Sequence, residues 1–442
     1  MSLFSPPTRR LLSWPRLFRA ILGLLFLFSA TAQAHPMPNS VVLLDLHPTG
    51  VAAELQLPLG ELQAAFGHGV ALHSETLVAR LGPELRRYLA QHVNPVSPDG
   101  NAWTVAVRDL RVQDATQTAA GPYQELVAHL WLTPAASESP RVFTFFYDVI
   151  VHQVVTHAAL VSVRRDWETG RVAADAPSEV GVIRLDVRDN FIPPLVINQA
   201  AGGWGLGFRG MVGLGIRHIA EGTDHLLFLL VLLLPAPLLL TKARRWGRFG
   251  GWRYGLGQLL RVVTAFTLGH SLTLLAGALG WLRLPGQPVE ILIAGSILVS
   301  AGHALRPLFP GREAWVAVGF GLVHGLAFAG TLADLQLPAG TMALSILGFN
   351  LGIELMQLLV VGITVPWLML LSQTPAYAAV RVGGAGLAAV AALAWLAERI
   401  STQANPLTTL VARVATYAPW LLAALAVAAV LSFWQQRKAL GA

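Results

Sequence analysis

Residues 215–234 read GIRHIAEGTDHLLFLLVLLL, an apolar run whose first half carries His218, Glu221, Asp224 and His225. Ionisable side chains inside a membrane helix are costly and normally face a polar interior, so their presence indicates a functional site. On a continuous helix His218 and His225 lie two turns apart on one face, with Glu221 between them. Two imidazoles on one stripe, with carboxylates beside them, predict a site for a divalent transition metal ion.

The composition of the chain predicts a membrane protein. Of its 442 residues, 54% are hydrophobic and 12% are charged, whereas soluble proteins carry about 25% charged residues. Polar residues are concentrated before residue 210 and long apolar runs after it, which predicts a water-facing domain followed by a membrane domain. The net charge of +7 is typical of basic residues at cytoplasmic helix ends, so no nucleic-acid partner is expected. The absence of cysteine excludes thiolate metal ligands.

The amino terminus has the features of a secretory signal peptide over residues 1–34. Several arginines precede an apolar segment at 20–28, and Ala32-Gln33-Ala34 matches a signal-peptidase cleavage site. The domain that follows, residues 35–205, is therefore expected outside the cytoplasm as a periplasmic domain.

This extracytoplasmic domain is predicted to be rich in β-strands. Short alternating or β-branched runs separated by turn-forming residues favour an antiparallel, β-sandwich-like fold. The runs lie at 40–46, 51–57, 103–107, 125–132, 142–151, 159–164 and 182–187. One or two helices are expected within 59–92, and residues 189–207 are predicted to be the linker into the membrane.

Residues 206–442 are predicted to form a transmembrane helical bundle of about seven spans in a lipid bilayer, since a helical span requires ~20 residues. The apolar stretches lie at 209–240, 256–280, 288–306, 314–333, 340–371, 377–397 and 409–434. The loop between the first two spans contains Lys242 and several arginines but no acidic residue, which assigns it to the cytoplasm. Alternating spans then place the carboxyl terminus in the cytoplasm, in a multi-pass protein of the cytoplasmic (inner) membrane.

Further polar side chains recur in later spans. At about 1.5 Å per helical residue, several of them reach the middle or outer half of the bilayer, near the level of His225. These residues are His270, His324, Asn350 and Glu354. The bland alternative is a buried polar network that only joins the helices, but so many ionisable groups would make a costly network.

Three more polar residues of the membrane half are expected to have secondary or structural roles: Gln357, Glu290 and His303. Gln357 shares a helical face with Asn350 and Glu354. Glu290 is expected near the outer surface. His303 is expected near the cytoplasmic end of its span, as an ordinary residue of a helix end.

Several motifs, in order along residues 209–360, resemble the HupE/UreJ family of membrane proteins. His218-Ile-Ala-Glu-Gly-Thr-Asp224-His225 is similar to the family signature H-P-x-x-G-x-D-H. Four later phrases resemble further family motifs: FTLGHSLTL (266–274), EILIAGSI (290–297), GLVHGLAFAG (321–330) and FNLGIELMQ (349–357). The preceding domain resembles the larger branch of the family, in which an extracytoplasmic domain precedes the spans.

The resemblance implies a nickel or cobalt permease of the kind associated with hydrogenase and urease maturation. It implies that the metal is bound by His218, Asp224, His225, His270, His324 and Glu354. Ile219 stands where the signature has proline, and that proline would help to break the helix and open backbone carbonyls to an ion.

Three functions remain open from the sequence. The first is a permease for a divalent transition metal, nickel or cobalt, with its site near the midplane. His218 and Glu221 would receive the ion from outside, and the β-rich domain would capture metal or recognise a metal carrier or other protein partner. The second is an intramembrane hydrolase with a zinc cofactor, in which Ser271 and Asp224 are the candidate catalytic residues. The third is a non-catalytic assembly or sensor protein.

Overall fold

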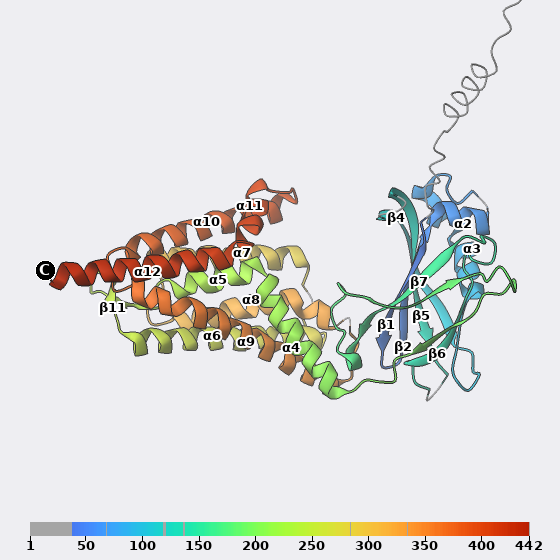
Figure 1. Ribbon diagram of the computed structural model, residues 1–442, viewed down its shortest axis with the longest axis horizontal. Helices are drawn as coiled ribbons and strands as arrows, with labels where there is room; N and C mark the ends of the chain where they lie inside the picture. The colour runs from blue at the N-terminus through green and yellow to red at the C-terminus, as the bar shows by residue number, and fades with distance from the viewer. Residues whose placement is uncertain are drawn as a thin grey trace, which may run out of the picture.

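The computed structural model describes residues 38–67, 69–117, 121–135, 138–282, 284–333 and 335–441. The predicted signal peptide lies outside the described residues. A β-rich part and a bundle of helices follow one another along the long axis of the molecule (Figure 1).

The β-rich part consists of two sheets. The larger, six-stranded sheet has the order β4 (Thr104–Gln117), β5 (Gly121–Thr133), β2 (Gly50–Pro58), β1 (Ser40–His47), β7 (Ala158–Asp166), β8 (Ser178–Arg184). The smaller sheet has the order β3 (Val93–Val96), β6 (Val142–Tyr147), β9 (Leu195–Asn198). Side chains of both sheets, among them Leu44 and Phe145, share one core with helices α2 (Leu59–Phe66) and α3 (Leu77–His92). The predicted sandwich-like fold and the helices within 59–92 are therefore confirmed.

The prediction of a fully antiparallel sandwich is wrong at one pair of strands. β1 pairs with β2 in the antiparallel sense, as a short turn between them requires, but with β7 in the parallel sense. Between β2 and β7 the chain passes through the second sheet, so no hairpin constrains the direction in which β7 returns.

Several predicted boundaries in the β-rich part also need correction. β3 and β9 were not predicted, because four-residue strands are too short to show a clear alternation. β9 lies inside the predicted linker and pairs with β6. β6 ends at Tyr147 rather than at 151, and the last strand of the large sheet is Ser178–Arg184 rather than 182–187.

The rest of the chain is mostly helical, and this is a multi-pass membrane protein. Its described helices are α4 (Trp204–Glu221), α5 (Thr223–Leu233), α6 (Trp252–Ala278), α7 (Gly286–Leu305), α8 (Glu313–Ala333), α9 (Ala339–Leu371), α10 (Tyr377–Ser401), α11 (Pro406–Ala415) and α12 (Ala418–Gly441). Five of them, α6, α7, α9, α10 and α12, are long and apolar enough to cross a membrane. The count of about seven spans stays a prediction.

Two predicted spans are not single helices. The first, 209–240, is divided between α4 and α5, and residues after Leu233 lead into a hairpin of β10 (Leu238–Leu240) and β11 (Trp246–Phe249). The last, 409–434, is divided between α11 and α12. Hydropathy does not detect such interruptions, because the residues at the breaks are themselves apolar or small.

Glycines bring the helices that carry the membrane histidines into close contact. A Cβ on Gly269 of α6 would collide with the carbonyl of Val318, and one on Gly321 of α8 with the carbonyl of Phe266. Gly215 of α4 faces the backbone of α9 in the same way. Without side chains at these points the backbones can pack closely, as small residues allow in membrane bundles. Gly269 and Gly215 lie within one turn of His270 and His218, so the same packing brings these histidines toward the middle of the bundle.

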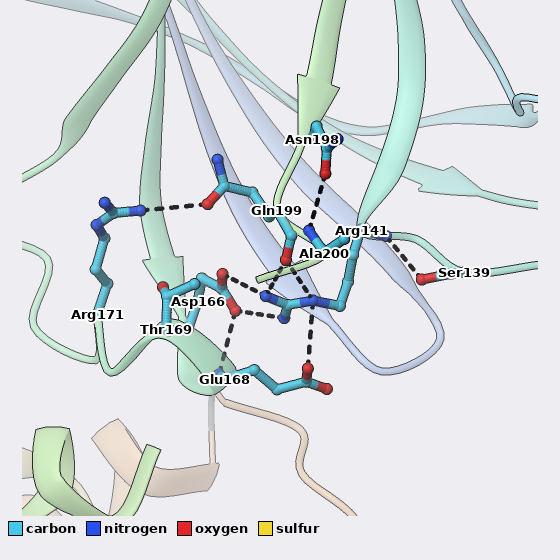
Figure 2. Close-up of polar contacts among 9 residues, drawn as sticks. All are labelled: Ser139, Arg141, Asp166, Glu168, Thr169, Arg171, Asn198, Gln199 and Ala200. Atoms are coloured by element: carbon cyan, nitrogen blue, oxygen red, sulfur yellow. Dashed lines mark hydrogen bonds and ion pairs between the residues drawn. The ribbon is translucent and has the colours of Figure 1, made fainter. Parts of the chain in front are cut away.

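The β-rich part is attached to the bundle through the end of β7 (Figure 2). Arg141 donates to both carboxylate oxygens of Asp166, at 2.6 and 2.8 Å, and to the carbonyl of Gln199. Its Nε also lies 3.3 Å from a carboxylate oxygen of Glu168. In the adjoining turn, the Trp167 indole N–H donates to Ser345 Oγ of α9 at 2.8 Å. The network thus joins three strand ends beside the contact with the bundle.

Replacing Arg141 by methionine is expected to destabilise the β-rich part by about 3–5 kcal/mol, because Asp166 is fully buried and would lose its charge partner. The measurement is the free energy of unfolding, followed by tryptophan fluorescence in denaturant. The matched control is Arg171→Met, since Arg171 makes only a 3.4 Å hydrogen bond to the Gln199 side chain and should change stability little. Equal stabilities for the Arg141 variant and the wild type would contradict this interpretation.

Candidate metal site

Four histidines from four different helices meet inside the bundle. They are His218 of α4, His225 of α5, His270 of α6 and His324 of α8. The ring of His225 lies 4.5 Å from that of His218 and 5.1 Å from that of His324, centroid to centroid. The ring of His270 lies 6.1 Å from that of His218. The imidazoles therefore form a continuous row, which the sequence predicted only as residues at similar depth.

The position of two members of the row depends on a break in the first predicted span. Gly222 leaves the helical conformation, with φ −72° and ψ 92°, between the end of α4 and the start of α5. A Cβ at this position would lie 2.7 Å from both the His218 carbonyl oxygen and His225 Nδ1. The break therefore forms without the signature proline, since Ile219 is a buried helical residue. It allows Asp224 and His225 to start a new helix beside His218.

The histidines of the row offer nitrogen atoms that have no hydrogen-bond partner. Among the buried side-chain atoms of the described residues, those without a partner include His218 Nε2, His225 Nε2, both ring nitrogens of His270, and His324 Nδ1. Asn350 of α9 lies within interaction distance of His270, and its Oδ1 has no hydrogen bond of regular geometry. A buried polar atom with no partner is costly, and each such atom requires an explanation. Coordination of a metal ion would supply the missing partner.

In His225 and His324, a neighbouring side chain determines which of the two ring nitrogens has a free lone pair. His225 Nδ1 lies 3.0 Å from Asp224 Oδ1, so the proton is on Nδ1 and the lone pair of Nε2 is free. His324 Nε2 lies 3.0 Å from Ser296 Oγ. The Ser296 hydroxyl already donates to the carbonyl of Ile293 at 2.7 Å. It must therefore accept from His324, which leaves the lone pair on Nδ1.

Phenylalanine rings pack against several members of the row. Phe328 and Phe349 contact His218, with ring centroids at 4.8 and 5.3 Å. Phe228 and Phe266 each lie 5.2 Å from the ring of His324. Because these rings offer no hydrogen bonds, an ion in the row would exchange its water ligands for imidazole nitrogens.

A cavity of about 160 Å³ lies beside Asp224, the hydrogen-bond partner of His225. Asp224 and Thr223 line it together with Glu290 of α7 and with Trp395 and Arg399 of α10. Glu290 and Arg399 form an ion pair of 2.5 Å, and their side chains are 48% and 39% exposed. The cavity therefore extends from this half-exposed ion pair to Asp224.

Comparison with known proteins gives a family for the helical part of the chain. The family model described as "HupE / UreJ protein" matches residues 196–399. Over these residues the chain belongs to the HupE/UreJ family. The match begins in β9 and ends in α10, so the HupE/UreJ region contains every residue of the histidine row and of the cavity. No curated protein and no solved structure matches the chain.

Some predicted site residues of the HupE/UreJ region lie outside the row. The Glu354 carboxylate accepts from the Thr267 hydroxyl at 2.8 Å, and the same hydroxyl contacts Gln357 Oε1 at 3.1 Å. Glu354 thus belongs to a polar group one helical turn from Asn350. Glu221 is exposed at the end of α4. His303 accepts from the backbone N–H of Leu308 at its helix end, as an ordinary structural residue would.

Ser296 is the site residue that sequence reasoning missed. It lies in the family-like phrase EILIAGSI, in which only Glu290 had been singled out. A serine in an apolar helix is a weak signal, because such hydroxyls usually bond to their own backbone. The orientation of Ser296 toward His324 depends on the packing of α7 against α8, which the sequence does not show.

Proposed function

We propose that this protein is a membrane permease for a divalent transition metal ion, with nickel as the expected substrate and cobalt as the alternative. The observation that carries the proposal is the row of four imidazoles with free nitrogens, three of them buried and that of His218 partly buried. Family membership supports it at a general level, since the HupE/UreJ family is associated with nickel and cobalt transport. Imidazole and carboxylate ligands suit such borderline ions, and no thiolate is present.

The row offers more nitrogen ligands than one ion needs at a time. Neighbouring ring centroids lie 4.5 to 6.1 Å apart, a spacing at which adjacent imidazoles can share one ion. We propose that the ion passes between overlapping pairs of these ligands, because a permease must release its ion, whereas a hydrolase would retain a zinc ion on its histidines.

Polar groups on both sides of the row provide a route for the ion. On one side the cavity leads from Glu290 and Arg399 to Asp224. On the other side the polar group of Glu354, Thr267 and Gln357 lies one helical turn beyond Asn350. We propose that ions enter from the side of the β-rich part. The hairpin β10–β11 and the basic carboxyl-terminal segment lie at the opposite end of the bundle (Figure 1), as expected for the cytoplasmic face.

The geometry does not favour the hydrolase alternative. The Ser271 hydroxyl, the nucleophile in that hypothesis, donates to the Thr267 carbonyl of its own helix at 2.7 Å. Asp224 is engaged with His225 rather than with a serine. Transport is therefore the function that we test first.

The test is uptake of Ni²⁺ and Co²⁺ into liposomes that contain the purified protein. Saturable, protein-dependent uptake of either ion is expected. Metal analysis of the same preparation distinguishes the rival functions. About one tightly held Zn²⁺ per chain, with no uptake, would support the hydrolase. No metal binding and no uptake would support the assembly or sensor protein.

Replacing Ser296 by alanine is expected to weaken metal binding by about 10- to 100-fold, because His324 would lose the partner that sets its tautomer and orientation. The measurement is the dissociation constant for Ni²⁺ by isothermal titration calorimetry. The matched control is Ser300→Ala. Ser300 is also buried in α7, but its hydroxyl donates only to the Ser296 carbonyl. If the two variants bind Ni²⁺ equally well, Ser296 does not position His324 for the metal.

A further inference from the structure

The geometry points to a second metal-binding site, formed in the β-rich part by His92, Asp148 and His152. Among the described residues, one ligand atom from each of these three lies within 4.8 Å of the other two. We infer that this site captures a divalent transition metal ion such as Ni²⁺ or Zn²⁺ from the surrounding solution. The inference does not depend on transport through the bundle.

Pairing between two short strands brings the three residues together. His92 is the last residue of α3 and directly precedes β3, and Asp148 directly follows β6. Val93 and Tyr147 are register partners in the β3–β6 pair, and the Asp148 N–H donates to the His92 carbonyl at 3.2 Å. His152 lies beside these two residues, because its backbone N–H donates to the Asp148 carbonyl at 3.0 Å.

Asp148 sets the tautomer of both histidines. His92 Nδ1 lies 2.7 Å from the Asp148 carboxylate, and His152 Nδ1 lies 2.9 Å from the Asp148 backbone carbonyl. A carboxylate and a carbonyl accept hydrogen bonds, so both Nδ1 atoms carry the proton and both Nε2 lone pairs are free. Metal-binding histidines are held in this way, with the second nitrogen donating to a carboxylate or a backbone carbonyl.

The two imidazoles are also aligned with each other. Their rings are stacked, with centroids 4.2 Å apart and an angle of 19° between the planes. Both rings are held through Nδ1 by one residue and are nearly parallel, and a ring nitrogen of each lies within 4.8 Å of a ring nitrogen of the other. The Tyr88 ring packs against His92, with centroids 4.5 Å apart, and limits its rotation.

A strained turn holds His152 in this position. Ile150 has φ of 67°, a backbone conformation that β-branched residues rarely adopt. Its N–H donates to the Tyr88 hydroxyl at 3.0 Å, and its side chain is fully buried. The packing thus enforces an unfavourable turn between Asp148 and His152, and such strain is concentrated at functional sites.

The site is open to solvent, unlike the row of histidines in the bundle. The side chains of His92 and Asp148 are 22% and 40% exposed, so water molecules can complete the coordination of an ion. Two imidazole nitrogens together with water suit Ni²⁺, Zn²⁺ or Cu²⁺. The site lies at the Tyr147 end of β6, and the Arg141 network that faces the bundle lies at the other end. It can therefore bind an ion independently of the bundle.

The test measures Ni²⁺ bound per chain by equilibrium dialysis of the full-length protein in detergent. His92→Ala and His152→Ala are each expected to lose one equivalent of bound Ni²⁺. Asp148→Asn is expected to raise the dissociation constant of the Ni²⁺ bound at this site about 10- to 100-fold. The control is His73→Asn. His73 is an exposed histidine in the left-handed backbone region, which asparagine tolerates, and its replacement should lose no metal.

A second measurement on the unaltered protein keeps the inference testable if a variant fails to fold. Diethylpyrocarbonate modifies free imidazole nitrogens, and mass spectrometry locates the modified residues. Ni²⁺ is expected to protect His92 and His152 but not His73. Modification of His92 and His152 at the same rate with and without Ni²⁺ would overturn the inference. Uptake by liposomes remains a separate readout, so failure of this site and failure of the proposed permease are distinguishable.

Discussion

Uptake of Ni²⁺ is expected to fall on the order of 100-fold when His225 is replaced by alanine, since loss of even an outer-shell partner weakens metal sites 10- to 100-fold. His225 is one of the two inner members of the row, 4.5 Å from the ring of His218 and 5.1 Å from that of His324. Its removal also leaves Asp224 without its hydrogen-bond partner. The measurement is the initial rate of uptake into liposomes, normalised to the amount of folded protein.

The control for this experiment is His303→Gln. His303 is also a buried histidine of the helical part, but it lies at the end of α7, against Phe309 and Trp246. Glutamine can still accept from the Leu308 N–H that His303 Nδ1 now accepts from. Uptake by this variant should match the wild type. Equal uptake by the His225 variant would instead show that the row is dispensable, as the assembly or sensor alternative requires.

Replacing Gly222 by alanine is expected to abolish Ni²⁺ binding at the row of histidines, but not in the β-rich part, while the helices remain folded. The added Cβ would lie 2.7 Å from the His218 carbonyl and from His225 Nδ1, and 3.2 Å from Asp224 Oδ1. Atoms cannot approach so closely, so the break must open and the three metal-binding residues must move apart. The measurement is Ni²⁺ binding by calorimetry, with helix content followed by circular dichroism.

Gly213→Ala is the matched control for this prediction. Gly213 lies in the same helix, α4, and no heavy atom lies within 4 Å of the position where its Cβ would be placed. An alanine there should leave Ni²⁺ binding unchanged and stabilise the helix slightly. Unchanged binding by the Gly222 variant would mean that the helix break does not position the ligands.

The two proposed sites would bind the metal ion at different stages of transport. The open group of His92, Asp148 and His152 would bind an ion from solution, and the enclosed row would bind it within the bundle. The Arg141 network, with Trp167 bonded to Ser345, holds the part that carries the first site against the bundle. Each variant proposed above, apart from the controls, affects one of these three features.

Several features could be predicted from the sequence because they depend on residue type along a single element. Long apolar runs predicted the helical membrane part, and alternation predicted most strands of the β-rich part. Ionisable residues in apolar helices are rare enough that His218, Asp224, His225, His270 and His324 could be singled out, and the structure places them together. The family motifs around them pointed to HupE/UreJ proteins, and the match over residues 196–399 confirms this.

Tertiary structure decided the features that depend on how distant segments pack. Glu354 shares a helical face with Asn350, yet the packing of α9 on α6 directs it to Thr267 instead of the histidines. Ser296 sets the tautomer of His324 only because α7 lies against α8. His92 and Asp148 are far apart in the sequence and meet through the pairing of β3 with β6. Sequence pattern reports the environment of one element, whereas a ligand set is defined by contacts between elements, and those contacts exist only in the folded chain.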